Sequence, residues 1–295
     1  MKKIFITGGS GFLGWHIKEV AKKNKIKVVV YDVHVPSKKE AGVTYIKGDI
    51  CDIKKMKLAF KGCDTFFHIA AIADIGETRS KPVETMDVNV IGTAKCLLVA
   101  KEAGAKHFVF ASSAYAAGKL GSFYRVSKLA SENLCKTFNE EYGLPFTIVR
   151  YGSLYGLRAT ESNSIYQLCE AVINGKSFEH YGTEEDIREH IHVEDAARET
   201  MNIAKIKEYK NKTVFITGHQ RIYMKDLFNI VGEIVGKKIK INYLKAVNHR
   251  HYKSTPWSFQ PDIPIRINMK DYIDISEGVH SCLQEAYDSA CRKKT

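Results

Sequence analysis

The stretch TGGSGFLG, residues 7–14, decides the fold of this chain. Its glycines Gly8, Gly11 and Gly14 follow the apolar run Lys3–Thr7 directly and precede a helical pattern. A glycine fingerprint needs this context of strand, turn and helix. We expect Gly8 to permit the tight turn, Gly11 to let the backbone approach a pyrophosphate, and Gly14 to let the helix pack on its strand. Unpaired N–H groups at the start of the helix would then bind the phosphate charge.

The next apolar run, residues 27–32, ends in the carboxylate of Asp32. An acid at this place hydrogen-bonds the ribose hydroxyls of the adenosine and repels a 2′-phosphate, so the sequence favours NAD over NADP. Lys38 and Lys39 follow in a predicted loop and weaken this preference without reversing it. The alternative interpretation of Asp32 is a solvated strand end.

Composition fits a soluble enzyme. The chain has 295 residues and 44% hydrophobic content, enough to bury one large core or two unequal ones. No apolar run approaches the ~20 residues of a membrane span, and no signal segment precedes the first strand. The seven cysteines show no CxxC spacing and predict reduced thiols in a cytoplasm. The histidines lack partners at metal-ligand spacing, so we expect no metal.

The net charge of +12 raises the possibility of a nucleic-acid-binding protein. The lysines, however, are scattered and form no basic stripe interleaved with aromatic residues, so no nucleic-acid partner is expected. A lysine-rich surface that aids solubility explains the charge. The other interpretation is attraction of an anionic substrate.

Apolar strands alternate with amphipathic helices, which predicts an α/β fold with a doubly wound parallel sheet. After Asp32 the predicted strands are 44–47, 64–70, 106–111, 146–151 and 213–217, and the predicted helices are 54–60, 83–103, 124–142, 165–174 and 195–204. The expected domains are a cofactor domain, 1–152 with 189–217 returning to it, and a smaller substrate domain, 153–188 and 218–295. Ligands of such sheets lie beyond the carboxyl ends of the strands.

The chain resembles the extended short-chain dehydrogenases/reductases, and among them the NAD-dependent epimerases and dehydratases of nucleotide sugars. Ordered motifs between Lys3 and about Gly236 carry the resemblance. They are TGGSGFLG (7–14), GDI (48–50), FHIAA (67–71), NVIGT (89–93), FVFASS (108–113), YRVSK (124–128), RYGSLYG (150–156) and REHIHVED (188–195).

The resemblance implies a site residue by residue. Residues that would bind NAD are Gly8, Gly11, Phe12, Leu13, Asp32, Asp49, Ile50, Ala70, Ala71, Asn89, Tyr124, Lys128 and Tyr151. Those that would contact a nucleotide-sugar substrate are Ser113, Ser153 and Arg188, and the catalytic residues would be Ser113, Tyr124 and Lys128. It also implies a homodimer formed through the helices 83–103 and 124–142, a two-fold contact.

The chemistry follows from the residue types as well. Tyr124 and Lys128 share one face of a helix, and an ammonium beside a phenol favours the phenolate. Tyr124 could then take the proton of a sugar hydroxyl while the carbon-bound hydrogen leaves as hydride. Ser113 would hydrogen-bond the same oxygen. The alternative for the tyrosine and lysine alone is an ordinary pair of helix neighbours.

Several positions depart from the family pattern. Ala114 and Tyr115 stand where the 4,6-dehydratases carry an Asp-Glu pair, so the acid and base that elimination needs are missing. Ser153 replaces an asparagine that commonly contacts the diphosphate. Arg188 is retained and suits phosphate oxygens, with a surface ion pair to Glu184 or Glu185 as the alternative.

The segment His249–Phe259 lies outside the family pattern and mixes basic and aromatic residues. It could stack a nucleobase or line a sugar pocket, and the alternative is a packed domain edge.

The leading hypothesis is a nucleotide-sugar epimerase that oxidises and re-reduces its substrate with NAD. A one-way reductase or dehydrogenase is the first alternative, and a non-catalytic NAD-sensing protein is the second. The presence of Ser113, Tyr124 and Lys128 argues against a non-catalytic protein.

Overall fold

A computed structural model describes residues 1–37, 40–244, 265–267, 269 and 271–292. Lys38, Lys39 and the segment 249–259 therefore lie outside the described residues.

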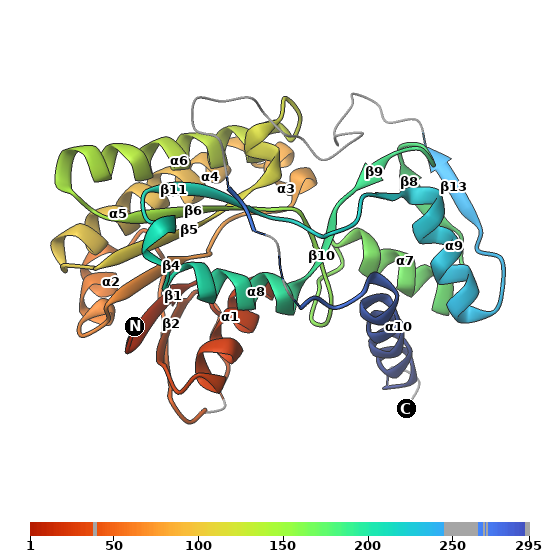
Figure 1. The fold of residues 1–295 in the computed structure, drawn as a ribbon, viewed down its shortest axis with the longest axis horizontal. Helices are drawn as coiled ribbons and strands as arrows, with labels where there is room; N and C mark the ends of the chain where they lie inside the picture. Colours follow the sequence, from red (N-terminus) through yellow and green to blue (C-terminus); the bar gives the residue numbers. More distant parts are fainter. Residues whose placement is uncertain (38–39, 245–264, 268, 270, 293–295) are drawn as a thin grey trace.

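Most of the described residues surround one parallel sheet (Figure 1), which has eight strands in the part of the chain that the structure describes. From edge to edge they are β14 (Ile265–Arg266), β11 (Lys212–Ile216), β6 (Phe146–Tyr151), β5 (His107–Ser113), β4 (Thr65–His68), β1 (Lys3–Thr7), β2 (Lys27–Asp32) and β3 (Val43–Lys47). The order reverses between β1 and β4, and parallel sheets of this kind bind ligands at such a switch point. The predicted α/β fold is confirmed.

Helices cover both faces of the sheet (Figure 1). One face packs against α1 (Phe12–Lys23) and α8 (Val193–Ile203). The other packs against α2 (Ile53–Phe60), α5 (Gly92–Glu102) and α6 (Ser122–Tyr142). The central strands β4, β5 and β6 are buried along their whole length. Strands that are covered on both faces require continuous apolar runs, which is how they read in the sequence.

The predicted helix 83–103 is divided into three parts. It consists of α4 (Pro82–Met86), the π-helix η1 (Asp87–Ile91) and α5, and a short helix α3 (Ile75–Ser80) precedes it. A π-helical turn widens a helix by one residue and frequently marks a functional site. Here it places Asn89 beneath the loop that follows β4.

A second core lies beside the first, on the right of Figure 1. Its helices are α7 (Ser164–Ile173), α9 (Met224–Val235) and α10 (Ile275–Arg292). Three strand pairs accompany them: β7 (Ser153–Tyr155) with β10 (His190–His192), β9 (Ile187–Arg188) with β12 (Ile222–Tyr223), and β8 (Phe178–Tyr181) with β13 (Ile241–Leu244). Two 3-10 turns complete the elements, η2 (Ala114–Ala117) and η3 (Lys207–Tyr209).

One segment differs from the predicted division of the chain. β14 pairs in parallel with β11 and so belongs to the large sheet, although the sequence placed residues 218–295 in the second domain. A strand of two residues is too short to show the alternation of a strand in the sequence. Residues 265 and 266 form a strand because they pair with the edge of β11.

Among the described helices, none combines the length and the apolar character that crossing a bilayer requires.

Candidate active site

The glycine turn between β1 and α1 is shaped as a phosphate cradle. Gly8 has φ +71°, and a Cβ atom there would lie 2.6 Å from the Ala70 backbone nitrogen. A Cβ at Gly14 would lie 2.1 Å from the Gly8 carbonyl oxygen, so neither glycine tolerates a side chain. Gly11 caps α1 without any side-chain hydrogen bond, and the buried hydroxyl of Ser10 has no partner among the described residues. Open N–H groups and an unpaired hydroxyl fit a diphosphate.

Asp32 lies beside this turn, at the end of β2. Its Oδ2 accepts a hydrogen bond of 3.0 Å from the Ser10 amide, and its Oδ1 accepts one of 3.0 Å from the His34 amide. The two amides fix the orientation of a half-buried carboxylate next to the cradle. Glycine turn and acid therefore meet the requirements of a dinucleotide whose ribose carries free hydroxyls.

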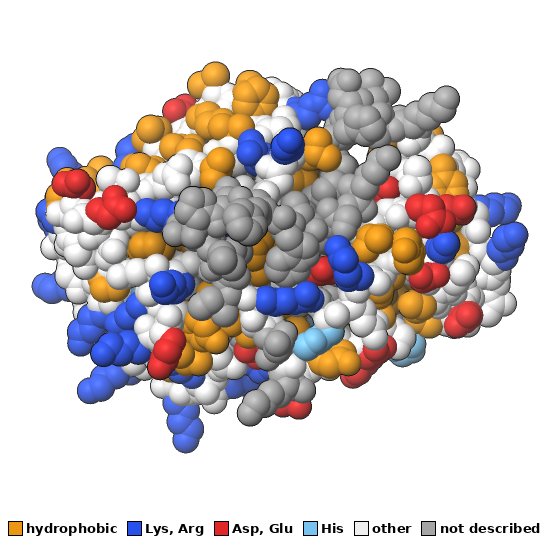
Figure 2. All heavy atoms as spheres, turned by 45° about the horizontal axis from the view of Figure 1, so that its top comes forward, with side chains coloured by type: hydrophobic (Ala, Val, Ile, Leu, Met, Phe, Trp, Pro, Cys, Tyr) orange, Lys and Arg blue, Asp and Glu red, His pale blue; other side chains and the backbone are white. Residues whose placement is uncertain are grey.

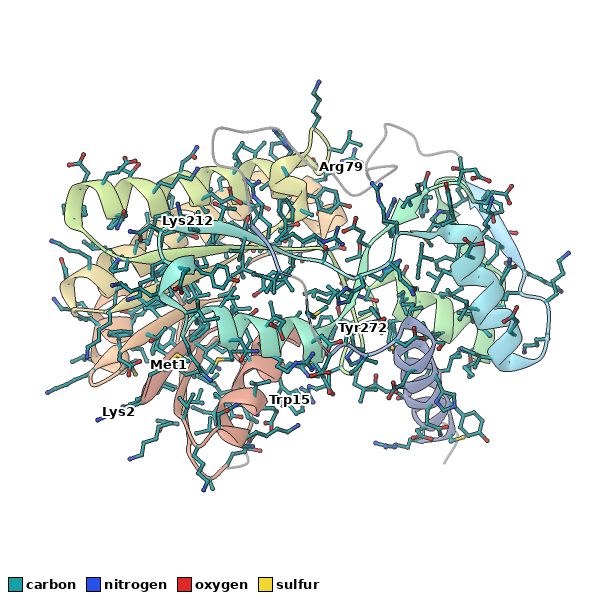
Figure 3. The ribbon with its side chains drawn as sticks, in the orientation of Figure 1. Met1, Lys2, Trp15, Arg79, Lys212 and Tyr272 are labelled. Carbon is teal, nitrogen blue, oxygen red and sulfur yellow. The ribbon has the colours of Figure 1, made fainter. Side chains whose placement is uncertain are left out.

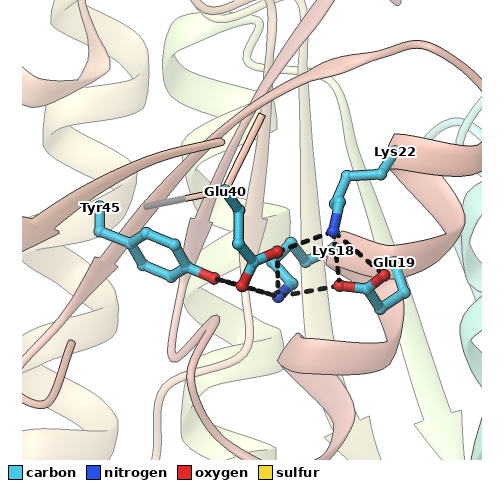
Figure 4. A network of polar contacts seen from close by, with 5 residues as sticks. All are labelled: Lys18, Glu19, Lys22, Glu40 and Tyr45. Atoms are coloured by element: carbon cyan, nitrogen blue, oxygen red, sulfur yellow. Dashed lines mark hydrogen bonds and ion pairs between the residues drawn. The ribbon is translucent and has the colours of Figure 1, made fainter. Parts of the chain in front are cut away.

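A buried lysine anchors the chain that follows Asp32 (Figure 4). The Lys18 side chain is 0% exposed, and its Nζ lies 2.9 Å from Glu40 Oε1 and 3.0 Å from the Tyr45 hydroxyl. Burial raises the pKa of Glu40, but hydrogen bonds from Lys22, Tyr45 and Lys18 outweigh it and hold that pKa at about 2. These contacts tie Tyr45 of β3 and Glu40 to α1.

The other predicted cofactor residues differ in exposure. Phe12, Ala70 and Ala71 are half-buried, whereas Leu13 and Ile50 are buried. Asp49 is exposed, and its Oδ1 accepts a hydrogen bond of 2.7 Å from the Cys51 amide.

Asn89 holds the loop after β4 in place. Its Oδ1 accepts from the Ile72 amide at 2.8 Å, and its Nδ2 donates to the Ile72 carbonyl at 2.9 Å and to Ser127 Oγ at 3.0 Å. The side chain is buried, and these bonds engage both of its N–H donors. Asn89 therefore joins the loop that contains Ala70 and Ala71 to α6, and we infer that it serves the cofactor site by positioning this loop.

The three predicted catalytic residues meet where β5 ends beside α6. Lys128 Nζ donates to the Ala111 carbonyl of β5 at 2.7 Å and lies 5.6 Å from the centre of the Tyr124 ring. Ser113 is the last residue of β5 and is 8% exposed. Tyr124 is half-buried on the first turn of α6. The helix and the strand thus bring a hydroxyl, a phenol and an ammonium to the carboxyl end of β5, inside the sheet.

Burial changes the acid strength of this ammonium. It lowers the pKa of Lys128 to about 8, and the carboxylate of Glu132 partly offsets the effect. Lys128 is therefore predominantly protonated at neutral pH and loses its charge as the pH rises through about 8. Its attraction for a neighbouring phenolate is present below that pH.

Sequence reasoning missed the buried ion pair behind these residues. Arg150 Nε donates to Glu132 Oε1 at 2.8 Å, and Arg150 Nη2 donates to Glu132 Oε2 at 2.6 Å. Ser112 Oγ also donates to Glu132, at 2.5 Å. The two charged side chains are 2% and 1% exposed, so α6, β5 and β6 are joined in the protein interior. The pair fixes the helix that presents Tyr124 and Lys128.

Tyr151 lies in the core between the sheet and α8. Its ring is 5% exposed, and its hydroxyl and Thr200 Oγ1 form a hydrogen bond of 2.6 Å. Burial raises its pKa. The hydroxyl is thus engaged by the protein, so a contact of Tyr151 with a cofactor would have to come from another part of the residue.

Ser153 and Arg188 lie on neighbouring segments of the second domain. The Ser153 amide donates to the Glu189 carbonyl at 3.2 Å, directly after Arg188 in the chain. Arg188 is 9% exposed. Its Nη1 donates a hydrogen bond to the backbone carbonyl of Ile187, and its Nη2 lies 3.5 Å from Asp186 Oδ2. A largely buried arginine is not the surface ion pair that the alternative interpretation required, and Glu185 pairs instead with Lys225.

A shallow pocket, open to solvent, lies elsewhere, in the region between α8 and α10 where Figure 3 labels Tyr272. Its lining is Tyr155, His190, Ile191, His192, Asp195, Gly218, His219, Gln220, Ile222, Met269, Tyr272, Ile273, Asp274 and Ile275. None of the predicted catalytic residues contributes to it. The glycine turn with Asp32, and the group formed by Tyr124 and the buried Lys128, carry the functional groups that the predicted chemistry needs. We therefore place the candidate site there and not at this pocket.

Comparison with known proteins agrees with the fold and the motifs. Residues 4–217 match the model of the NAD dependent epimerase/dehydratase family. A UDP-glucuronate 4-epimerase of Thermodesulfobacterium geofontis is 26% identical over 93% of both chains. A putative UDP-glucose 4-epimerase of Methanocaldococcus jannaschii is 25% identical over 92% of this chain and 97% of its own.

Solved structures give the same fold. The UDP-glucuronic acid 4-epimerase of Bacillus cereus, crystallised with UDP-glucuronic acid and NAD, superposes with a TM-score of 0.84 at 21% identity. The match covers 97% of this chain and 99% of that one. Other relatives are named as a decarboxylase and a dehydratase of nucleotide sugars. By its family match, its fold and its ordered motifs, the chain belongs to the NAD-dependent epimerase/dehydratase family, and the predicted cofactor, NAD, is that of the family.

Proposed function

We propose that this protein is an NAD-dependent epimerase that inverts C4 of a UDP-sugar through a transient keto intermediate. The observation that carries the proposal is the buried Lys128, which lies between the β5 carbonyl of Ala111 and the ring of Tyr124. Relatives that cover nearly the whole chain are named as UDP-sugar 4-epimerases, which supports the nucleotide and the carbon.

The residues divide the chemistry between them. Tyr124, as a phenolate stabilised by the Lys128 ammonium, takes the proton of the C4 hydroxyl, and the oxygen becomes a carbonyl. Ser113 donates a hydrogen bond to that oxygen while its charge changes. When bound, NAD supplies the two-electron oxidation at C4 and the reverse reduction. After the keto-sugar has turned, Tyr124 returns its proton to the oxygen of the inverted alcohol.

Two side chains argue against a dehydratase. Ala114 is buried and has no ionisable group, and Tyr115 is a weak acid. Elimination of water across C5 and C6 needs an acid and a base at this place, and neither residue supplies the carboxylates of the dehydratases.

A panel of UDP-sugars tests the proposal. Incubation of each sugar with the protein and catalytic NAD should interconvert one pair of C4 epimers, followed by ¹H NMR. The carbon-bound hydrogen at C4 should not exchange in D₂O, because the hydrogen removed is the one returned. Conversion that consumes NAD in step with product would instead establish a dehydrogenase, and conversion that requires NADH and consumes it in step with product would establish a reductase.

The Asp32 carboxylate should set the cofactor preference. We expect Asp32→Ala to weaken NAD binding roughly 10–100-fold, since a charged hydrogen bond contributes about 1.5–3 kcal/mol. NADP binding should change little or improve, because the repulsion of the 2′-phosphate disappears. Isothermal titration with both cofactors measures the two affinities. Glu140→Ala, which removes an exposed carboxylate of α6, is the matched control. Tighter binding of NADP than of NAD by the unaltered protein would contradict the assignment.

We also propose a homodimer through the helical residues 83–103, which comprise most of α4, η1 and α5, and through α6. Large hydrophobic side chains are exposed on these elements, namely Val83 (73%), Ile91 (49%), Phe123 (40%) and Val126 (48%). Figure 2 shows hydrophobic side chains gathered on the upper part of the face that these helices turn toward the viewer. An exposed apolar patch of this kind typically marks an interface, and a two-fold contact would bury it against itself.

Introducing negative charge into the patch tests the dimer. The double variant Ile91→Glu, Val126→Glu should be a monomer at micromolar concentration, where the unaltered protein should be a dimer. The molar mass from light scattering distinguishes the two states. Leu58→Glu places the same charge on α2, at a residue that is 77% exposed, and should leave the dimer intact. A monomeric unaltered protein would refute the proposal.

A further inference from the structure

Tyr115 contacts two of the three residues on which the proposed reaction depends. Its ring meets the ring of Tyr124 edge to face, with 6.2 Å between the centroids and 74° between the planes. Its backbone amide donates to Ser113 Oγ at 3.3 Å. The side chain is half-buried on η2, the short turn that follows β5.

The chain makes room for this ring at one position. Gly121 precedes α6 and has φ +111°, and a Cβ atom there would lie 2.6 Å from Tyr115 Cδ1. The Nε of Arg125 donates to the Gly118 carbonyl and ties the start of α6 back to η2. The ring of Tyr115 therefore packs against Gly121, directly before α6, and against Tyr124 in the first turn of that helix.

The Tyr124 ring thus has an aromatic neighbour and a cationic one. The Lys128 ammonium lies 5.6 Å from its centre, and Tyr115 packs against it edge to face. Edge-to-face pairs have a preferred geometry, so they resist rotation of either ring. An aromatic ring also excludes water, and a phenolate attracts an ammonium more strongly where water does not screen the charges.

We propose that Tyr115 is a positioning residue, whose ring holds the Tyr124 phenol in the orientation and the dry surroundings from which it exchanges a proton with the sugar hydroxyl. The proposal rests on the proposed epimerase function. The ring performs this task rather than the hydroxyl, because the contact with Tyr124 is a ring contact. Tyr115 would then present an aromatic ring where the dehydratases carry the glutamate of their Asp-Glu pair.

Two substitutions separate ring from hydroxyl. Tyr115→Phe keeps the ring and should retain kcat within about threefold. Tyr115→Ala removes it and should lower kcat roughly 10–100-fold, with KM for the sugar changed much less, because orientation matters most in the transition state. Activity is measured on the UDP-sugar that the unaltered protein turns over. Tyr166→Ala, which removes another half-buried tyrosine ring on α7, should leave kcat unchanged.

A second readout does not depend on the substrate. In NAD-loaded protein labelled with ¹³Cζ-tyrosine, the Tyr124 signal is assigned through its loss in Tyr124→Phe. Its titration midpoint should move to higher pH by about one unit in Tyr115→Ala and should stay in place in Tyr115→Phe. If Tyr115→Ala does not fold, Tyr115→Gln, which keeps much of the bulk but replaces the apolar ring by a polar group that binds water, should show the same shift.

The outcomes decide between the two proposals. Unchanged kcat and an unchanged Tyr124 titration in Tyr115→Ala would overturn the role of Tyr115. Equal damage in the Phe and Ala variants would overturn it as well, because it would assign the effect to the hydroxyl. If no UDP-sugar is converted by the unaltered protein, the proposed function fails, while the NMR titration still decides whether Tyr115 acts on Tyr124.

Discussion

Tyr124→Phe should lower turnover of the UDP-sugar by ~10²–10⁴-fold, the range that loss of a general acid–base group produces. Only the phenol oxygen is removed, so the ring contact with Tyr115 and the packing of α6 should persist. NAD affinity should remain nearly unchanged, because the glycine cradle and Asp32 lie at another part of the site. Initial rates over a range of substrate concentrations, together with NAD titration, measure both properties.

Two neighbouring substitutions should behave differently. Ser113→Ala should slow turnover without weakening NAD, because it removes one hydrogen bond to the reacting oxygen. Lys128→Ala should damage turnover and NAD binding together if the ammonium both stabilises the phenolate and holds the ribose. Near-normal activity of Tyr124→Phe on the true substrate would show that the assignment of all three residues is wrong.

Glu132→Ala should destabilise the protein by about 3–5 kcal/mol, because it leaves the Arg150 guanidinium buried without its counter-charge. Arg150 is 2% exposed and donates two hydrogen bonds to Glu132, so water cannot replace the lost carboxylate. Urea denaturation followed by circular dichroism gives the free energy of unfolding. The double variant Glu132→Leu, Arg150→Met should recover most of the loss, since apolar residues of similar volume often replace a buried pair without penalty.

An exposed ion pair provides the contrast. Lys57 and Glu102 lie 2.9 Å apart with side chains that are 50% and 36% exposed. Glu102→Ala should not move the denaturation midpoint measurably, because water solvates both groups and exposed pairs contribute little. Equal effects of Glu102→Ala and Glu132→Ala would contradict the account of the buried pair.

Much of the candidate site could be predicted because it is encoded locally. The glycine turn requires a positive φ at Gly8 and the absence of a Cβ at Gly14, and both requirements are visible as residue types in TGGSGFLG. Tyr124 and Lys128 are four residues apart on one helix, so their proximity follows from the helical repeat alone. Glu132 continues the same spacing by one further turn, and this signal could have been used to find it.

The partner of Glu132 could not be found in this way. Arg150 lies on another strand, and the pair forms only because β5 and β6 are neighbours beneath α6. The same holds for Asn89, whose bonds to Ile72 and Ser127 depend on how η1, the loop after β4 and α6 come together.

By itself, the sequence determined the alternation of strands and helices, the cofactor turn, the acid at the end of β2 and the pairing of Tyr124 with Lys128. Each depends on backbone conformation or on a spacing of a few residues, which local residue types specify. Only the tertiary structure decided the return of β14 to the sheet, the burial of the Arg150 pair and the packing of Tyr115 on Tyr124. These contacts join segments whose proximity arises from the packing of the whole fold, and burial there determines which charges and rings interact.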